Sequence, residues 1–203
     1  MDDWRESVHL VLRHDAVCDR NGETINASVT QVDLHDFCRL CLTVGLGGFH
    51  CVTPLEAQHR ISTEIMAFWQ KGYGQEYNPD RKEALACLHL HREFDEVVAM
   101  VTRLHGAAPL ILGTSAQRQE KTLDFAAVSS ILLPLGRPVV LQFGTAWGLS
   151  EQQIHRCDWV LPPIDGYNGY NHLSVRCAAA ILVDRFVHAM RTEPLGDDTH
   201  ERH

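Results

Sequence analysis

Two glycine-rich loops in the C-terminal third of the chain are well suited to bind a small molecule. The first is FGTAWGL at residues 143–149, and the second is PPIDGYNGYNH at residues 162–172. Glycine lets backbone N–H and C=O groups approach a ligand that a Cβ atom would obstruct. Each loop follows a short apolar run (139–143 and 159–161) typical of buried parallel strands. Because ligands of open α/β sheets bind beyond the carboxyl ends of the strands, the two loops predict one ligand site.

The elements that must position these loops alternate along the whole chain. Asp33 is expected to cap a helix that ends at Gly45 or Gly47, and Pro54 to begin the next helix. Further helices are expected near residues 93–104, 123–132 and 171–191, and Asn21-Gly22 is a strong turn signal. A strand before each helix indicates a parallel, doubly wound α/β sheet of about six strands. The expected strands are residues 8–13, 49–52, 84–90, 110–112, 139–143 and 159–161.

Length and composition indicate one globular domain over residues 1–203, with residues 191–203 as a flexible acidic tail. No apolar run approaches the ~20 residues that span a bilayer. The acidic N-terminus is unlike a signal peptide, so we expect a cytoplasmic protein without a membrane partner. The net charge of −8 opposes nucleic-acid binding by bulk electrostatics. An RNA-binding chain of this composition needs a local basic patch.

Several other patterns are weaker signals of chemistry. Cys38 and Cys41 have metal-ligand spacing, but they lie mid-helix without a second pair, so we expect core thiols. His89 and His91 lack a recognisable third ligand, so surface or loop positions and no metal are expected. The glycines at residues 45–48 follow a helix and precede a strand, the reverse of a dinucleotide loop. The Gly-x-Gly-x-Gly that follows the first strand of a Rossmann-type methyltransferase is also missing, so that class is disfavoured.

The two glycine-rich loops also carry a family resemblance. FGTAWGL resembles the second motif of the SPOUT, or α/β-knot, RNA methyltransferases, and LPPIDGYNGYNHLSVRCAAAILVDR (161–185) resembles their third motif. The similarity extends to HDFCR (35–39), YNPDRKEAL (77–85) and LGTSA (112–116). Within that class the chain is similar to a small bacterial stand-alone group, whose domain is sometimes fused to the tRNA guanine-N1 methyltransferase. Ala146 stands where the family usually has glycine, which strains the loop only if that position needs a positive φ.

The resemblance implies a C-terminal trefoil knot, a homodimer and S-adenosylmethionine (SAM) as cofactor, with S-adenosylhomocysteine as product. It implies methyl transfer to RNA, with tRNA the first candidate. His172 or Asn171 could orient the acceptor, and Arg39 is a third catalytic candidate. RNA contacts are expected from Arg13, His35, Arg39, Lys121 and Arg176. The expected cofactor-binding residues are Leu112, Gly113, Thr114, Phe143, Gly144, Thr145, Trp147, Gly148, Leu149, Leu161, Pro162, Ile164, Gly166, Asn171, His172, Leu173 and Ser174.

Two alternatives to an RNA methyltransferase stay open at this point. A SAM-binding knot module with a regulatory or RNA-binding role, without methyl transfer, is consistent with Ala146 and with the acidic charge. A small-molecule α/β enzyme is weaker, because no other cofactor signature is present. The general base and the acceptor atom are not identified by the sequence.

Overall fold

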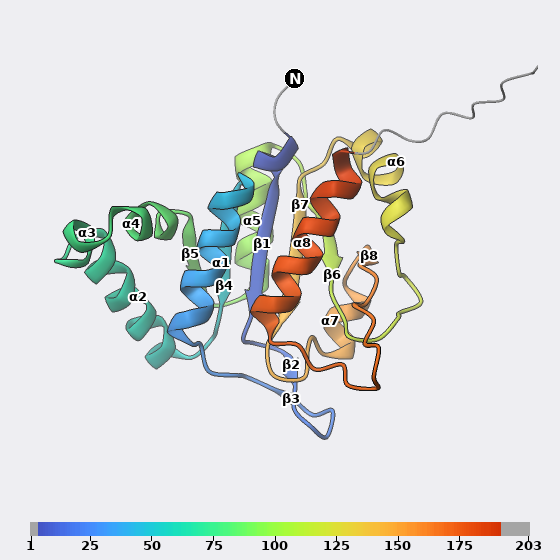
Figure 1. Ribbon diagram of the computed structural model, residues 1–203, viewed down its shortest axis with the longest axis horizontal. Helices are drawn as coiled ribbons and strands as arrows, with labels where there is room; N and C mark the ends of the chain where they lie inside the picture. Colours follow the sequence, from blue (N-terminus) through green and yellow to red (C-terminus); the bar gives the residue numbers. More distant parts are fainter. Residues whose placement is uncertain (1–3, 192–203) are drawn as a thin grey trace, which may run out of the picture.

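The computed structural model describes residues 4–191 and has a six-stranded parallel sheet at its centre (Figure 1). The strand order is β5-β4-β1-β7-β6-β8, so the N-terminal strand β1 lies in the middle, paired with β4 and β7. This confirms the expected parallel sheet. The strands are β1 (Val8–Arg13), β4 (Gly48–Val52), β5 (Leu88–His91), β6 (Leu110–Gly113), β7 (Val139–Gly144) and β8 (Trp159–Val160).

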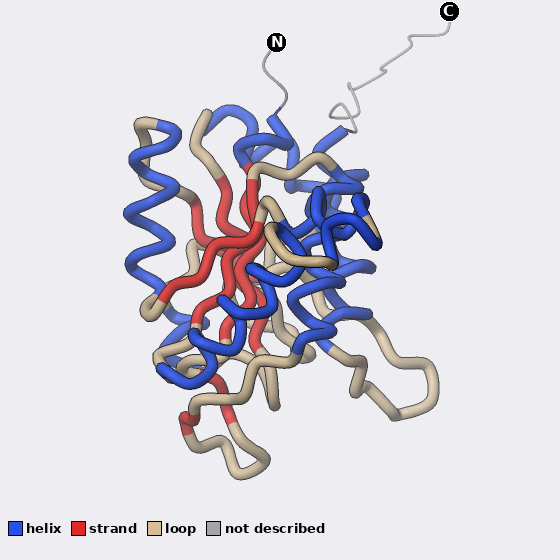
Figure 2. The backbone as a smooth tube through the Cα atoms, turned by 90° about the vertical axis from the view of Figure 1, so that its left-hand side faces the viewer, coloured by secondary structure: helices blue, strands red, loops and turns tan. Residues whose placement is uncertain are grey.

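Helices cover both faces of the sheet (Figure 2). Helices α1, α6 and α8 pack on one face, whereas α5 packs on the other through Phe94, Val97 and Val101. The helices are α1 (Gln31–Val44), α2 (Glu56–Gln70), α3 (Gly74–Tyr77), α4 (Pro79–Leu85), α5 (Phe94–His105), α6 (Val128–Leu132), α7 (Glu151–His155) and α8 (Val175–Arg191). Short 3-10 helices are η1 (Trp4–Ser7), η2 (Phe125–Ala127) and η3 (Leu133–Leu135). None of the described helices is long and apolar enough to cross a membrane.

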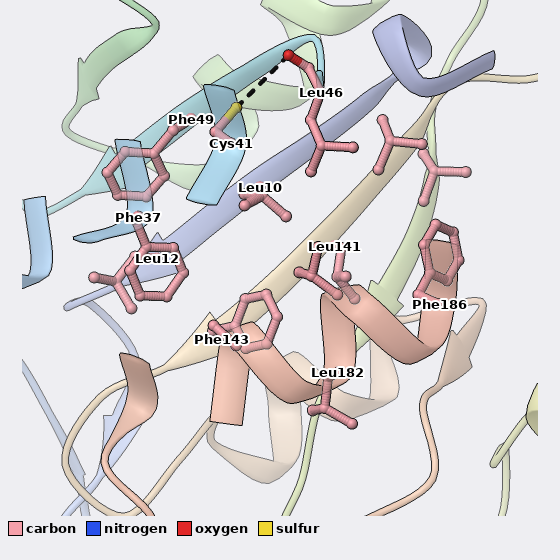
Figure 3. Close-up of a cluster of buried hydrophobic side chains, with 14 of the residues drawn as sticks. Leu10, Leu12, Phe37, Cys41, Leu46, Phe49, Leu141, Phe143, Leu182 and Phe186 are labelled. Carbon is pink, nitrogen blue, oxygen red and sulfur yellow. Dashed lines mark hydrogen bonds between the residues drawn. The ribbon is translucent and has the colours of Figure 1, made fainter. Parts of the chain in front are cut away.

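The main core lies between the sheet and the helices α1 and α8 (Figure 3). Phe37 of α1 stacks on Phe49 of β4 at 5.1 Å and meets Phe143 of β7 edge-on at 5.7 Å, both measured between ring centroids. Burial of one such side chain contributes about 1.5–3 kcal/mol. Cys38 and Cys41 are buried free thiols in this core, as predicted.

Several element boundaries differ from the sequence-based predictions. Thr30, not Asp33, caps α1, because its hydroxyl accepts the Asp33 N–H. Helix α2 begins at Glu56, two residues after Pro54. The expected strand 84–90 is wrong in its first half, where Ala84 and Leu85 end α4. Helix α8 begins at Val175 rather than near residue 171. The acidic tail expected at residues 191–203 lies, apart from Arg191, outside the described residues.

A small hairpin follows β1 at the carboxyl edge of the sheet (Figure 1). It consists of β2 (Val17–Cys18) and β3 (Thr24–Ile25), and its turn contains Gly22 with a φ of 85°. The turn was predicted from Asn21-Gly22, but the two flanking strands were not. Cys18 also exchanges backbone hydrogen bonds with the loop after β7, through Gly148 O (2.9 Å) and Trp147 N (3.0 Å). The hairpin is therefore joined to the first glycine-rich loop.

The edge strand β8 is flanked on both sides by chain that precedes it in the sequence. On one side it pairs with β6. On the other, Val160 N donates to Lys121 O and Leu123 N donates to Val160 O, both at 2.9 Å. The chain leaving β8 then runs past the segment after β6, where Asn171 Nδ2 donates to Ala116 O at 3.1 Å. The trefoil knot implied by the resemblance stays a prediction.

A row of histidines lies between α5 and the sheet. His9 Nδ1 lies 3.1 Å from His50 Nε2, and His50 Nδ1 lies 3.0 Å from His91 Nε2. His9 Nε2 lies 2.9 Å from His105 Nε2 of α5. His91 belongs to β5 and is 8% exposed, so the expected surface or loop position is wrong for this residue. His89 also belongs to β5 and is half-buried.

Burial lowers the pKa of His9, His50 and His91 in this row, which should make the protein sensitive to acid. Desolvation lowers the pKa of His9 from 6.5 to about 4 and that of His50 to about 2. Desolvation also lowers the pKa of His14, at the end of β1, to about 4. Each folded-state pKa lies below its unfolded value, so the unfolded chain binds more protons between these values. Stability is thus fully present above pH 6.5 and is lost as the pH falls towards 4.

We expect the free energy of unfolding to fall by about 1 kcal/mol per buried histidine between pH ~7.5 and ~5.5. Chemical denaturation at both pH values measures this loss. His50→Gln should reduce the loss of unfolding free energy between the two pH values by the contribution of one histidine. His155→Gln changes an exposed position and should leave this loss unchanged. An equal pH dependence in His50→Gln and the parent protein would contradict the assignment to the histidine row.

Candidate cofactor site

A cavity of about 1470 Å³ lies at the carboxyl ends of the strands. Its walls come from five stretches of chain: residues 18–33, 114–121, 143–155, 164–175 and the side chains of Ala178 and Leu182 of α8. The two glycine-rich loops lie in the same cavity, as predicted. A second cavity of about 300 Å³, between η2 and α8, contains none of the predicted site residues.

Most of the expected cofactor residues line the large cavity. Leu112 and Leu161 do not, because both are fully buried in the sheet core. Gly113 packs against the segment between α7 and β8, where an added Cβ would lie 2.6 Å from Cys157 Sγ. Pro162 and Gly166 also lie outside the cavity lining. The lining residues from the predicted set are Thr114, Phe143, Gly144, Thr145, Trp147, Gly148, Leu149, Ile164, Asn171, His172, Leu173 and Ser174.

The first glycine-rich loop has a tight backbone that requires its glycines. A Cβ on Gly144 would lie 2.4 Å from Leu149 N, so only glycine allows the chain to close here. Gly148 has a φ of 100°, a conformation that L-residues rarely adopt, and the space beside its Cα is open. The space beside Gly148 Cα is thus open to a ligand, whereas a larger residue there would strain the loop itself.

Two alanines adopt the left-handed conformation at this edge of the sheet. Ala146, in the position where the resembled family usually has glycine, has a φ of 52°, and Ala16 has a φ of 48°. Position 146 therefore needs a positive φ, and the alanine there strains the loop. The cost of such a conformation for a residue with a Cβ is about 1–2 kcal/mol.

Of the expected RNA-contacting residues, Lys121 lines the cavity and the other four do not. Arg13 is 1% exposed, and its guanidinium binds Asp15, Gln142 and Gln153, so the expectation that it holds phosphate is wrong. Lys121 lines the cavity, and its Nζ donates to His155 O and Cys157 O at 3.1 and 3.0 Å.

The three remaining candidates lie on the helices behind the cavity. Arg176 of α8 forms ion pairs with Asp33 (3.1 Å) and Asp36 (3.0 Å) of α1. His35 is half-buried and packs edge-on against Trp69, and its pKa is lowered mainly by burial. Arg39 is exposed on α1 and does not line the cavity.

The structure adds two charged residues that sequence reasoning missed. Arg20, in the hairpin turn, is exposed, lines the cavity and forms no ion pair with any residue in the described part of the chain. Asp33 lines the cavity and is 7% exposed. The Asn21-Gly22 turn next to Arg20 was the available signal. For Asp33 the sequence suggested only a helix cap. Residues 4–191 contain no group of histidine, cysteine or acidic residues that could hold a metal ion.

Comparison with solved structures defines the class of fold. The chain superimposes on a protein described as a probable methyltransferase from Bordetella pertussis with a TM-score of 0.60 and 17% identity, over 94% of this chain and 99% of that one. It also superimposes on the SpoU methyltransferase AviRb from Streptomyces viridochromogenes, solved with AdoMet, with a TM-score of 0.53 and 14% identity. That match covers 89% of this chain and 56% of AviRb. The fold is that of the SpoU-type methyltransferases.

Sequence comparison then gives the family. Residues 7–188 match the family described as SAM-dependent RNA methyltransferase, and the chain belongs to this family. SAM is accordingly the cofactor of its class. A relative from Oleidesulfovibrio alaskensis, named tRNA (guanine-N(1)-)-methyltransferase, is 38% identical over 179 residues. The match covers 88% of this chain but 41% of that protein, so the chain spans less than half the length of this relative.

Replacing Ala146 with glycine should relieve the strain in the first glycine-rich loop. We expect Ala146→Gly to raise the free energy of unfolding by up to about 1 kcal/mol, since the gain is partly offset by a more flexible unfolded chain. Ala86→Gly is the matched control, because Ala86 is also exposed but has a φ of −67°. Equal or lower stability of Ala146→Gly in denaturant titrations would show that the left-handed alanine carries no strain.

Proposed function

We propose that this chain transfers the methyl group of SAM to a nucleotide of RNA, with tRNA as the first substrate to test. The observation that carries the proposal is the cavity at the carboxyl edge, where both glycine-rich loops meet in a chain of this family. The name of the Oleidesulfovibrio relative supports tRNA. Because this chain matches only part of that protein, the substrate itself belongs to the proposal.

The cavity lining is consistent with SAM in size and chemistry. Apolar side chains of Phe143, Leu149, Ile164 and Leu173 can pack on an adenosine, and the open space beside Gly148 Cα lets it approach the loop closely. The volume exceeds the ~300–1,000 Å³ usual for one small-molecule site, which leaves room for an acceptor nucleotide. We assign cofactor binding to the twelve predicted residues that line the cavity.

The residues of the protein mainly position the two substrates, SAM and the acceptor nucleotide. Bound SAM supplies a methyl group on a sulfonium, which is already a good leaving group. Asn171 is fixed by its hydrogen bond to Ala116 O, which leaves its side-chain oxygen free to accept from the acceptor. His172 is exposed at the cavity, with its ring edge-on to Tyr170 at 5.2 Å. We propose that Asn171 and His172 orient the acceptor, because fixing geometry is worth several kcal/mol of barrier.

The two glycine-rich loops favour RNA recognition by stacking, with few phosphate contacts. Trp147, Tyr167 and Tyr170 are 62%, 102% and 68% exposed on the two glycine-rich loops. Aromatic side chains of this kind can stack on unpaired bases. Arg20 and Lys121 are the two cations among the lining residues. A binding module without methyl transfer is the alternative, and family membership favours the enzyme over it.

Calorimetry with SAM, followed by a methyl-transfer assay on undermodified tRNA and rRNA, tests the proposed function. We expect micromolar SAM binding and transfer of labelled methyl to one RNA class. NAD and ATP, as controls, should not bind. Binding of SAM without transfer to any RNA would support the module, and no SAM binding would refute the site.

Removal of the exposed arginine at the cavity should weaken RNA binding selectively. Arg20→Ala should lower RNA affinity and reduce the slope of log affinity against log salt by about 0.7, the share of one phosphate contact. SAM affinity should stay near its original value. Arg39→Ala is the comparison, since Arg39 lies on the exposed face of α1. A lower RNA affinity in both variants would extend the RNA-binding surface over α1. An unchanged salt slope in both variants would exclude phosphate contacts by Arg20 and Arg39.

The expected homodimer, with α8 at its interface, remains part of the proposal. The family resemblance implies the dimer. Leu182, Phe186, Val187 and Met190 of α8 are buried within one subunit, so only the other side of this helix can face a partner. We expect a dimer mass in sedimentation at micromolar concentration, and a monomer mass there would exclude it.

A further inference from the structure

The charge of the cavity wall is opposite to what phosphate binding alone would require. Carboxylates outnumber cations among its lining residues: Asp19, Asp33, Glu120 and Glu151 face Arg20 and Lys121. Asp19, Glu120 and Glu151 are partly or fully exposed, where solvent and salt screen their charges. Asp33 is 7% exposed, so its charge acts through a medium of lower dielectric constant.

The carboxylate of Asp33 is held in a fixed orientation. Thr30 Oγ1 donates to Asp33 Oδ2 at 2.5 Å, and Arg176 Nε lies 3.1 Å from Asp33 Oδ1. Each oxygen has a second lone pair, so the group can still accept from, or attract, a ligand. A carboxylate that is fixed before binding loses little side-chain freedom when a ligand arrives.

The negative charge at this wall is not fully neutralised. Arg176 is shared between Asp33 and Asp36, so one guanidinium faces two carboxylates. His14, which feels the charge of Asp33, is neutral at pH 7 because burial lowers its pKa to about 4. The seam between α1 and α8 thus keeps a net negative charge next to the cavity.

We infer that Asp33 makes the cavity select the cationic sulfonium of SAM over the neutral thioether of S-adenosylhomocysteine. The inference rests on the proposed function. The two cofactor forms share the same adenosine and amino-acid groups and differ by one methyl group and one positive charge. Methyl transfer moves that charge away from the cofactor, so the attraction of Asp33 is lost and release of the product is favoured.

Equilibrium binding of SAM and S-adenosylhomocysteine to the full chain tests this inference without any activity measurement. We expect the wild-type protein to bind SAM about tenfold more tightly than S-adenosylhomocysteine. Asp33→Asn should lose about tenfold in SAM affinity and little in S-adenosylhomocysteine affinity, so that the ratio approaches one. Asp36→Asn is the matched comparison, because Asp36 also pairs with Arg176 but lies outside the cavity lining, so this variant should reduce the preference for SAM less than Asp33→Asn does.

Further measurements keep the test decisive if Asp33→Asn folds poorly. An analogue of SAM with an ammonium group in place of the sulfonium should bind like SAM to the wild-type protein. The preference for SAM should persist in added salt, because salt screens exposed charges more than the buried charge of Asp33. Wild-type affinities that are equal, or higher for S-adenosylhomocysteine, would overturn the inference. An unchanged ratio in folded Asp33→Asn would overturn it as well. Failure to bind either cofactor form would instead refute the proposed function.

Discussion

The parallel register between β1 and β7 determines the geometry of the whole carboxyl edge. Arg13 lies opposite Gly144, so the two strands end at the same level. Both the amide and the hydroxyl of Thr145 donate to Arg13 O, at 3.1 and 3.0 Å. The two chains then turn at Ala16 and Ala146 and stay paired through the bridge between Val17 and Leu149. A register shift of one residue would separate the hairpin from the first glycine-rich loop, and the cavity would lose one wall.

The buried guanidinium of Arg13 fixes this register from the α5 side of the sheet. It donates to Asp15, to Gln142 of β7 and to Gln153 of α7, and it lies 4.5 Å from the centroid of the Phe94 ring of α5. A buried charge is tolerated only when it is paired and hydrogen-bonded to this degree. The arginine that sequence reasoning assigned to phosphate therefore positions the site from within the core.

The sequence predicts the elements best where one signal dominates. Strands β1 and β7 are buried on both faces, and an apolar run indicates such a strand. The glycine-rich loops need positive φ angles, which glycine indicates. The boundary between α4 and β5 was missed because Ala84 to Leu88 is a continuous apolar run, and packing of α4 on α1 decides where the helix ends. The direction of Arg13 was missed because polar and apolar residues do not alternate in a strand covered on both faces. Asp33 and Arg20 reach the cavity through long-range folding, which no local pattern encodes.

The histidine row has a consequence for the positions of its protons. Each neutral imidazole carries one N–H, so in a chain of ring-to-ring hydrogen bonds every ring must donate in the same direction. Glu96 Oε2 lies 3.6 Å from His91 Nδ1 and favours a proton on that nitrogen. His91 Nε2 then accepts from His50 Nδ1, His50 Nε2 from His9 Nδ1, and His9 Nε2 from His105 Nε2. The tautomer of each ring is thus a collective property: one carboxylate beside β5 sets the proton position on a helix residue beyond β1.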